Sequence, residues 1–210
     1  KRKGIILAGG HGTRLGPITK VVTKQLIPVY DKPMIFYPLT LLMMAGIKDI
    51  LIICMKRDLE AYKALLGNGL NLGIKISYEI QFKQNGVAEA FLIGENFIGN
   101  NNVALVLGDN LLFGDSLMSN LKKSKENHRG AKVFAYRVKN PEYYGVIEFD
   151  KNDKVCSLVE KPKSPKSNFA VIGLYFYDNK VIEFAKKVKP SINQELQITL
   201  ENVFLRLQHT

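Results

Sequence analysis

The sequence predicts an α/β protein: an open, mostly parallel sheet with helices on both faces and a β-rich excursion in its second half. Two observations lead to this fold class. From residue 4 to residue 107, short apolar runs alternate with stretches of helical length, which is the pattern of parallel strands joined by right-handed crossover helices. From residue 131 onward the runs are strand-like and the breaks between them are short, which indicates β-structure added to the parallel sheet.

In the first half, strands and helices are predicted from local signals. Residues 4–8 form an apolar run that ends in glycine, which is typical of a buried parallel strand followed by a loop. A helix is predicted over 34–45, because Pro38 suits its first turn and Gly46 suits the position just after its end. The alternation continues with strands over 50–55, 74–80 and 103–107 and helices over 59–66 and 87–97.

The second half is predicted to be richer in strands. Strands are expected over 132–138, 145–149, 155–158 and 170–177, an exposed loop over 163–167, and helices over 180–188 and from 196 onward. Ligands of such sheets bind beyond the carboxyl ends of the strands. Residues 108–110, which follow the strand at 103–107, are therefore expected at the binding edge.

The length and composition fit one globular domain without a membrane span. A chain of 210 residues, 46% of them apolar, can bury one core. Its apolar runs are too short for a transmembrane helix, and the basic start leads directly into a short strand rather than into a signal peptide. We expect a cytoplasmic protein with no membrane partner.

The cysteines and histidines do not form a metal-binding pattern. Cys54 and Cys156 each lie in an apolar or alternating run, so buried free thiols are expected rather than a disulfide. The three histidines are far apart in the sequence, which excludes a zinc motif.

The net charge of +11 has two explanations: a polyanionic partner, or a site for phosphorylated substrates on a lysine-rich surface. The lysines are scattered along the chain, and no nucleic-acid-binding module is recognisable. We therefore expect no nucleic-acid partner.

A glycine-rich loop follows the first strand. Gly9, Gly10 and Gly12 leave room for backbone N–H groups to approach a phosphate, although a structural turn also uses glycine. The dinucleotide fingerprint requires a glycine where Leu15 stands, and no Gly-Lys-Ser/Thr sequence is present. The loop belongs to neither of these two phosphate-binding classes.

Two cations accompany this loop. Arg14 follows it at once and Lys24 lies ten residues further on, and cations in such positions stabilise charge on a transferring phosphorus and on leaving pyrophosphate. This favours phosphate binding over a solvated surface pair. It does not identify the substrate.

Several dispersed motifs resemble those of sugar-nucleotide pyrophosphorylases, and within them the glucose-1-phosphate thymidylyltransferases. The resemblance covers nearly the whole chain and implies a Rossmann-like, nucleotide-diphospho-sugar transferase fold, with residues 1–210 as a single nucleotidyltransferase domain. The matching stretches are 7–15, 24–26, 31–34, 107–110, 133–136, 144–146, 160–162 and 173–177.

The resemblance implies that a sugar 1-phosphate oxygen attacks the α-phosphorus of a nucleotide and pyrophosphate leaves. The substrates would be dTTP and glucose 1-phosphate, and the product dTDP-glucose would feed dTDP-rhamnose and related deoxysugar synthesis. Arg14 and Lys24 would act on the triphosphate as catalytic residues. The implied nucleotide-binding residues are Leu7, Gly9, Gly10, Gly12, Thr13, Gln25, Gln81, Gly86 and Asp109.

The resemblance further implies a metal ligand and a sugar site. Asp109 would hold Mg²⁺ together with substrate phosphates, an ordinary arrangement for this cation; taken alone, Asp109 would more simply be a turn or capping residue. The implied sugar-phosphate-binding residues are Tyr144, Gly145, Glu160, Lys161 and Val171.

The chain also departs from the family. His11 and Gly16 stand where relatives carry a small residue and an aromatic, and the segment 194–200 has Gln197 and Leu200 where acidic residues are usual. The family's second metal-binding aspartate and its C-terminal segment have no counterpart, so we expect this domain to lack its C-terminal part.

These departures leave alternatives open: a catalytically impaired relative with a regulatory role, or uridylyl transfer. Losing the last core segment would expose apolar surface, and we expect a homo-oligomer, either a dimer or a tetramer.

Overall fold

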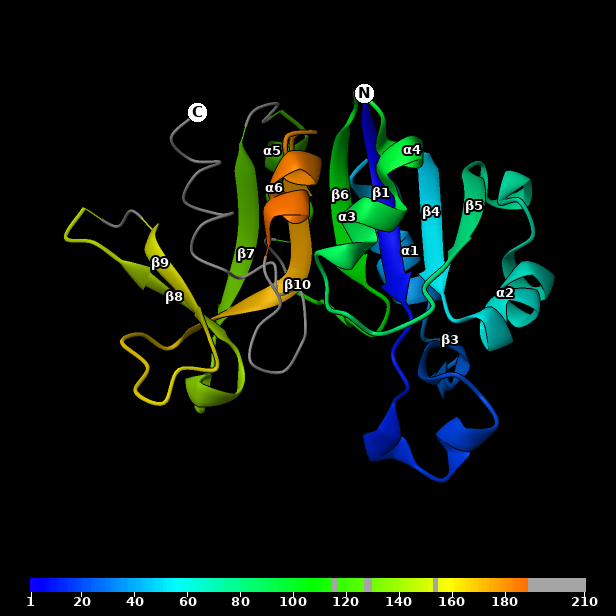
Figure 1. Ribbon diagram of the computed structural model, residues 1–210, viewed down its shortest axis with the longest axis horizontal. Coiled ribbons are helices and arrows are strands. Elements are labelled where there is room, and N and C mark those ends of the chain that lie inside the picture. Colours follow the sequence, from blue (N-terminus) through cyan, green and yellow to red (C-terminus); the bar gives the residue numbers. More distant parts are fainter. Residues whose placement is uncertain (115–116, 127–129, 153–154, 189–210) are drawn as a thin grey trace.

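The computed structural model (Figure 1) describes residues 1–114, 117–126, 130–152 and 155–188. Its main feature is an open eight-stranded sheet with the order β5-β4-β1-β6-β10-β8-β9, in which β7 pairs with β10 outside this path. A separate two-stranded hairpin joins β2 (Pro28–Val29) to β3 (Lys32–Pro33). The predicted open α/β sheet is confirmed.

The four strands that the first half contributes to the main sheet run parallel. They are β1 (Arg2–Ala8), β4 (Asp49–Cys54), β5 (Lys75–Ile80) and β6 (Asn102–Leu107), and β1 lies between β4 and β6. Successive residues of these strands point to opposite faces, so Ile5 and Ile6 belong to different core clusters and both are fully buried. The central strands β1, β4 and β6 contain continuous apolar runs because both of their faces are covered, whereas the edge strand β5 alternates apolar and polar residues.

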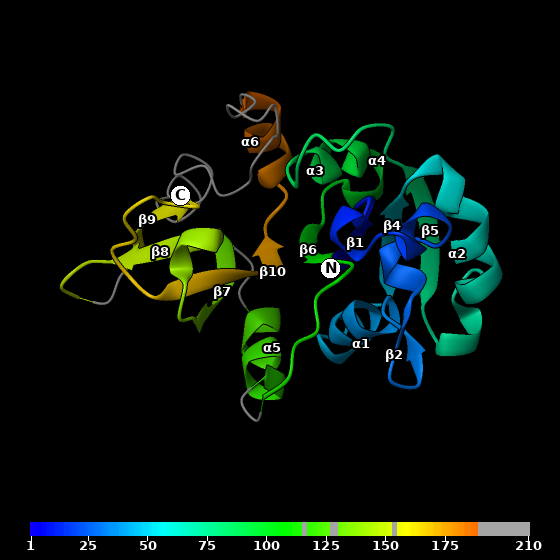
Figure 2. The same cartoon turned by 90° about the horizontal axis from the view of Figure 1, so that it is seen from below.

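Helices cover both faces of the sheet, as predicted. Figure 2 shows α3 (Glu89–Ile93), α4 (Glu95–Ile98) and α6 (Val181–Lys187) on one side, and α1 (Phe36–Met44) and α5 (Leu117–Glu126) on the other. Helix α2 (Leu59–Leu66) packs into the same core cluster as α1. Within the described residues, 3₁₀ turns span Thr13–Leu15, Ile18–Lys20, Lys24–Leu26, Lys56–Asp58, Leu70–Leu72 and Pro141–Tyr143.

Helix α1 ends as its sequence indicates. Gly46 has φ 73°, the left-handed conformation that glycine adopts without steric cost. Its N–H donates to Met43 O at 2.8 Å, and the Ile47 N–H donates to Leu42 O at 3.0 Å. These bonds satisfy carbonyls that the helix leaves free, which explains why the helix stops here.

One predicted helix is wrong in its extent: the stretch 87–97 forms two short helices, α3 and α4, that meet at Gly94. Gly94 is buried against the sheet, and a Cβ at this position would lie 2.9 Å from Ile5 Cδ1 and 3.0 Å from Ala90 O. The chain therefore bends where it touches the sheet most closely.

Two elements were not predicted. Helix α5 lies in a lysine-rich segment with little apolar character, but its Leu121 is fully buried in the same core cluster as α1. The β2–β3 hairpin is too short for a periodic pattern; its turn places Tyr30 at φ 62°. The helix predicted from 196 onward lies outside the described residues.

The second half adds antiparallel strands, as expected: β7 (Ala131–Arg137), β8 (Gly145–Phe149), β9 (Val155–Glu160) and β10 (Phe169–Tyr177). The long strand β10 joins the two halves. Its Leu174–Tyr177 part pairs with β6, whereas Ala170 pairs with Val146 in β8. The hairpin of β8 and β9 therefore projects from the main sheet (Figure 1).

Both cysteines are free, but only one is buried as expected. Burial raises the pKa of the Cys54 thiol to about 11. Cys156 is exposed, and that expectation was wrong. In the β8–β9 ladder, Glu148 pairs with Ser157 and Phe149 with Val155, so Cys156 is the extra residue of a bulge.

Among the described helices, none has the length and apolar character needed to cross a membrane.

The contact at Gly94 can be tested with a matched pair of substitutions. Alanine favours helix more than glycine does, but Gly94→Ala would drive a methyl group against Ile5. We expect it to lower the free energy of unfolding by about 1–3 kcal/mol. Asn96→Ala, on the exposed side of α4, should change that energy by less than about 0.5 kcal/mol. Urea unfolding measures both, and equal stability of the two variants would contradict the packing argument.

Candidate functional site

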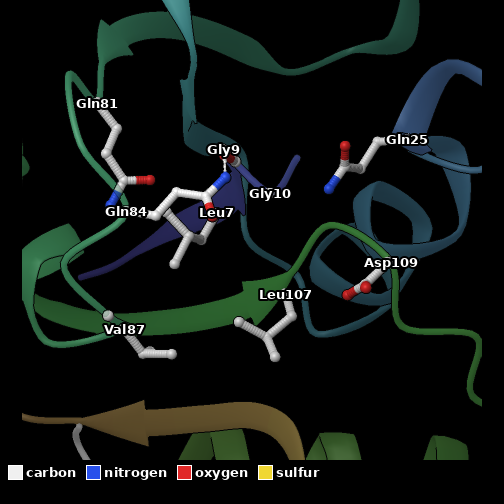
Figure 3. A pocket seen from close by; sticks show the side chains of 10 residues that line it. Leu7, Gly9, Gly10, Gln25, Gln81, Gln84, Val87, Leu107 and Asp109 are labelled. Carbon is white, nitrogen blue, oxygen red and sulfur yellow. Dashed lines mark hydrogen bonds between the residues drawn. The ribbon is translucent and has the colours of Figure 1, made fainter. Parts of the chain in front are cut away.

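A cleft lies at the carboxyl ends of β1, β5 and β6, which is where an open α/β sheet binds its ligands. Its volume is about 210 Å³, below the range of pockets that enclose a whole ligand, so it can hold one part of a larger substrate. Figure 3 shows the ten residues that line it: Leu7, Gly9, Gly10, Gln25, Gln81, Gln84, Gly86, Val87, Leu107 and Asp109.

The strand register brings the carboxyl ends of β1 and β6 together. Leu7 pairs with Leu107, and the Gly108 N–H donates to Leu7 O at 2.9 Å. Gly9 and Asp109 each follow two residues after this pair. The glycine loop and the acidic residue therefore leave the sheet side by side.

The glycine loop has one position that requires glycine for its conformation. Gly12 has φ 61°, and a Cβ there would lie 3.0 Å from Thr19 Cγ2 and 3.1 Å from Lys24 Cβ. Thr19 Oγ1 donates to Gly12 O at 3.0 Å, which closes the loop over the Lys24 segment. His11 is exposed on this loop.

Lys24 and Asp109 form an ion pair beside the cleft. Lys24 Nζ lies 2.7 Å from Asp109 Oδ2, and the two side chains are 30% and 37% exposed. A partly exposed pair of this kind contributes only about 0–1 kcal/mol to stability. An anion that approaches Lys24, or a cation that approaches Asp109, can therefore separate them at little cost.

Gln81 is buried at the other side of the cleft, with 3% of its surface exposed. Its Nε2 donates to Glu89 Oε2 at 2.6 Å, and its Oε1 faces Gly9, where a Cβ would approach it to 2.2 Å. Gln84 Nε2 donates to Gly9 O at 2.6 Å. The loop after β5 is thus fastened to the glycine loop after β1.

The Gln25 side chain is also buried, and neighbouring hydroxyl groups fix the orientation of its amide. Thr23 Oγ1 donates to its Oε1 at 3.0 Å, and the Tyr62 hydroxyl lies 3.5 Å from the same oxygen. Burial raises the pKa of Tyr62 well above its usual range, so this hydroxyl keeps its proton. With the oxygen occupied, the amide nitrogen points toward Gly10 and the cleft (Figure 3).

The expected sugar-binding residues form a second group, at one end of the β8–β9 hairpin and on the adjoining strand β10. Gly145 pairs with Glu160, and the Lys161 N–H donates to Tyr144 O at 2.9 Å. Lys161 has φ 45°, and its Nζ lies 3.8 Å from Glu160 Oε1. Val171 lies on β10, which pairs with β8 one residue before it.

A close contact of β10 connects the sugar-binding group to the cleft. Gly173 of β10 packs against Leu107 and Asn110, and a Cβ there would lie 2.4 Å from Leu107 Cδ1 and 2.8 Å from Asn110 Nδ2. Leu107 lines the cleft and Asn110 follows Asp109. The sugar group and the cleft are therefore joined through β10.

The structure places the expected residues in three neighbouring sets. Seven line the cleft, and the others lie in the adjoining loop or on the hairpin. The cleft set is Leu7, Gly9, Gly10, Gln25, Gln81, Gly86 and Asp109; the loop set is Gly12, Thr13, Arg14 and Lys24; the hairpin set is Tyr144, Gly145, Glu160, Lys161 and Val171. In the described part of the chain, no three His, Cys, Asp or Glu side chains cluster as a metal site.

Sequence reasoning missed the residues that hold the amides in place. Glu89, Tyr62 and Thr23 orient Gln81 and Gln25, and Gln84 fastens the two loops together. Glu89 follows Gln81 by eight residues at the start of a helix, a spacing that gives no signal until the loop is folded.

Comparison with known proteins identifies the family. Residues 3–206 match the family described as nucleotidyl transferase. A glucose-1-phosphate thymidylyltransferase of Neisseria meningitidis is 59% identical over 197 residues, which is 94% of this chain and 68% of the relative. One from Mycobacterium tuberculosis is 56% identical over 200 residues, which is 95% of this chain and 69% of the relative.

Solved structures agree. A Bacillus anthracis protein described as a glucose-1-phosphate thymidylyltransferase, in complex with a sucrose, has a TM-score of 0.89 and 41% identity, over 98% of this chain and 83% of that one. A UDP-glucose pyrophosphorylase complexed with UDP-glucose has a TM-score of 0.84 and 29% identity, over 100% and 88%.

The two adjacent glycines of the loop provide a matched test of the cleft geometry. A Cβ at Gly9 would collide with Gln81 Oε1, whereas at Gly10 the nearest atom would be 3.8 Å away. We expect Gly9→Ala to displace the buried amide and lower the free energy of unfolding by about 1–3 kcal/mol. Gly10→Ala should remain within about 0.5 kcal/mol of the unmodified protein. Thermal unfolding compares them, and a stable Gly9→Ala variant would show that the amide does not hold this position.

Proposed function

The chain belongs to the nucleotidyl transferase family, and from this premise we propose that it transfers a thymidylyl group from dTTP to α-D-glucose 1-phosphate. A phosphate oxygen of the sugar phosphate bonds to the α-phosphorus of dTTP, and the bond from that phosphorus to pyrophosphate breaks. The products are dTDP-glucose and pyrophosphate. The names and high identity of the relatives support this substrate pair.

One observation carries the proposal. The glycine loop, the Lys24–Asp109 pair and the buried Gln81 amide meet at a single edge of the sheet. These groups offer, in one place, donors for phosphate, a site for a cation and a polar group for a base. A nucleoside triphosphate requires all three.

The cations would stabilise the charge of the triphosphate. Lys24 points at the cleft edge, where it contacts Asp109, and Arg14 is exposed in the 3₁₀ turn that follows the glycine loop. When the bond to pyrophosphate breaks, negative charge grows on the leaving group, and fixed cations nearby lower the barrier. Backbone N–H groups of the loop would hold the phosphates in line.

We propose Mg²⁺ as the cofactor, with Asp109 as its protein ligand. The carboxylate fits: it is 37% exposed at the cleft edge, and Mg²⁺ commonly takes one or two carboxylates together with phosphate oxygens and water. The bound ion would neutralise phosphate charge. Lys24, whose Nζ lies 2.7 Å from the same carboxylate, would contact phosphate of the bound nucleotide.

The base would lie against Gln81, and Gly86 lines the same cleft. A side-chain amide distinguishes thymine or uracil from cytosine but does not detect the 5-methyl group. Uridylyl transfer is therefore the second candidate function. The structural similarity to a UDP-glucose pyrophosphorylase supports this second candidate.

The sugar phosphate would lie against the hairpin set. Glu160 would accept hydrogen bonds from sugar hydroxyls, and Lys161, which is exposed, would neutralise the phosphate. Gly145 is paired with Glu160 on the same two strands. Tyr144, just before β8, and Val171, on β10, would flank this position.

Pyrophosphate release tests the reaction and its proposed metal ligand together. With glucose 1-phosphate and Mg²⁺, we expect turnover with dTTP to exceed that with UTP. Asp109→Ala should lower kcat at least about 100-fold, the size of effect seen when one electrostatic group is removed from such a site. Asp31→Ala serves as the control, because Asp31 pairs with Lys32 at 2.9 Å in the exposed β2–β3 hairpin.

Equal loss in both variants would contradict the role of Asp109. Binding of dTTP without turnover would instead support a nucleotide-binding relative with a regulatory role.

We also propose that the chain self-associates. Several large apolar side chains are strongly exposed, among them Tyr30 at 97%, Phe113 at 80% and Phe82 at 78%, and a second chain could cover them. Sedimentation velocity at micromolar concentration should give a dimer or a tetramer. A single monomeric species would exclude this expectation.

A further inference from the structure

We propose that Glu89 positions the amide of Gln81 and thereby selects pyrimidines that carry a hydrogen on N3. The inference rests on the proposed function, because it concerns specificity in the same cleft. Glu89 does not line the cleft. It would act through Gln81, as a positioning residue.

The contacts of Glu89 leave it little freedom. Its Oε2 accepts a hydrogen bond from Gln81 Nε2 at 2.6 Å, and its Oε1 accepts one from Asn85 Nδ2 at 2.7 Å. Glu89 is the first residue of α3, between Ala88 and Ala90, which are fully buried. Both carboxylate oxygens are engaged on a helix that is anchored in the core.

A carboxylate accepts hydrogen bonds and does not donate them. The end of the Gln81 amide that faces Glu89 must therefore be the NH₂ group, and the opposite end must be the oxygen. Gln81 is only 3% exposed, so water cannot readily compensate for a reversed amide. Figure 3 shows the oxygen directed toward Gly9 and the interior of the cleft.

The neighbouring groups reinforce this orientation. Gly9 has no side chain, which allows the Gln81 oxygen to lie against the loop. The Gln84 amide nitrogen is committed to Gly9 O at 2.6 Å. The cleft thus presents a fixed acceptor at the position of Gln81.

A fixed acceptor discriminates between pyrimidines. Thymine and uracil present an N3–H donor, whereas cytosine has an acceptor at N3. In the same orientation, cytosine would place one acceptor against another and leave both without a hydrogen. A site built to pair with a donor rejects the analogue that lacks it, because a buried polar group remains unsatisfied.

Equilibrium binding of dUTP and dCTP tests this, since the two nucleotides differ only at N3 and the 4-position of the base. Calorimetric Kd values for the full chain should favour dUTP. Glu89→Leu removes the acceptor, and we expect the preference for dUTP to fall about tenfold, which is about 1.4 kcal/mol. Glu89→Gln retains a carbonyl acceptor and should restore most of the preference. The matched control is Glu79→Leu, at an exposed position of β5.

A double-mutant cycle separates positioning from a general structural effect. In a Gln81→Ala background, Glu89→Leu should cause no further change in the dUTP-to-dCTP ratio, because Glu89 acts through the amide. A second substitution, Glu89→Lys, replaces the acceptor with a donor and should turn the amide round, which shifts the ratio toward dCTP. If thermal unfolding shows that Glu89→Leu does not fold, the Glu89→Lys variant still tests the inference.

Two results would overturn the inference: an unchanged ratio in Glu89→Leu and Glu89→Lys, or a further change in the Gln81→Ala background. If the unmodified chain prefers dUTP and these variants do too, this inference alone fails. If the unmodified chain binds neither nucleotide, the proposed function fails with it.

Discussion

The parallel pairing of β1 with a strand on each side determines where the groups of the cleft lie. Leu7 pairs with Ile53 in β4 and with Leu107 in β6, so neighbouring strands end at the same level. Because β1 lies in the middle of the sheet and its side chains are buried on both faces, the chain can leave this strand only beyond its carboxyl end. Gly9, the first glycine of the loop, allows that exit without displacing the Gln81 side chain. A shift of one residue in this register would reverse every side chain of β1 and separate Gly9 from Asp109.

The polar groups of the cleft follow a common rule: each buried amide is held at one end so that the other end is available. Thr23 and Tyr62 approach the oxygen of Gln25 and leave its nitrogen toward the cleft, whereas Glu89 takes the nitrogen of Gln81 and leaves its oxygen. Fixed dipoles of this kind need no rearrangement when a ligand binds. The Lys24–Asp109 pair is different, because it is partly exposed and weak. The amides are suited to recognition, and the ion pair is suited to exchange.

Much of this arrangement could be predicted from the sequence, because it depends on local patterns. The buried parallel strands, the end of α1 at Gly46 and the position of Asp109 after a strand all follow from apolar runs and glycine chemistry. The break at Gly94 could not be predicted, since it arises from contact with Ile5 on another element. The exposure of Cys156 depends on a bulge in the strand register. The role of Glu89 could not be predicted for the same reason, because Gln81 becomes its neighbour only when the loop has folded.

The hardest feature to foresee is the dual role of β10, which joins the main sheet to the hairpin that projects from it. Leu174–Tyr177 belongs to the main sheet through β6, while Ala170 holds β8. Between these parts, Gly173 lies so close to Leu107 and Asn110 that a Cβ there would displace their side chains. The hairpin that carries Glu160 and Lys161 is therefore tied, through one strand, to the end of β6 from which Asp109 emerges.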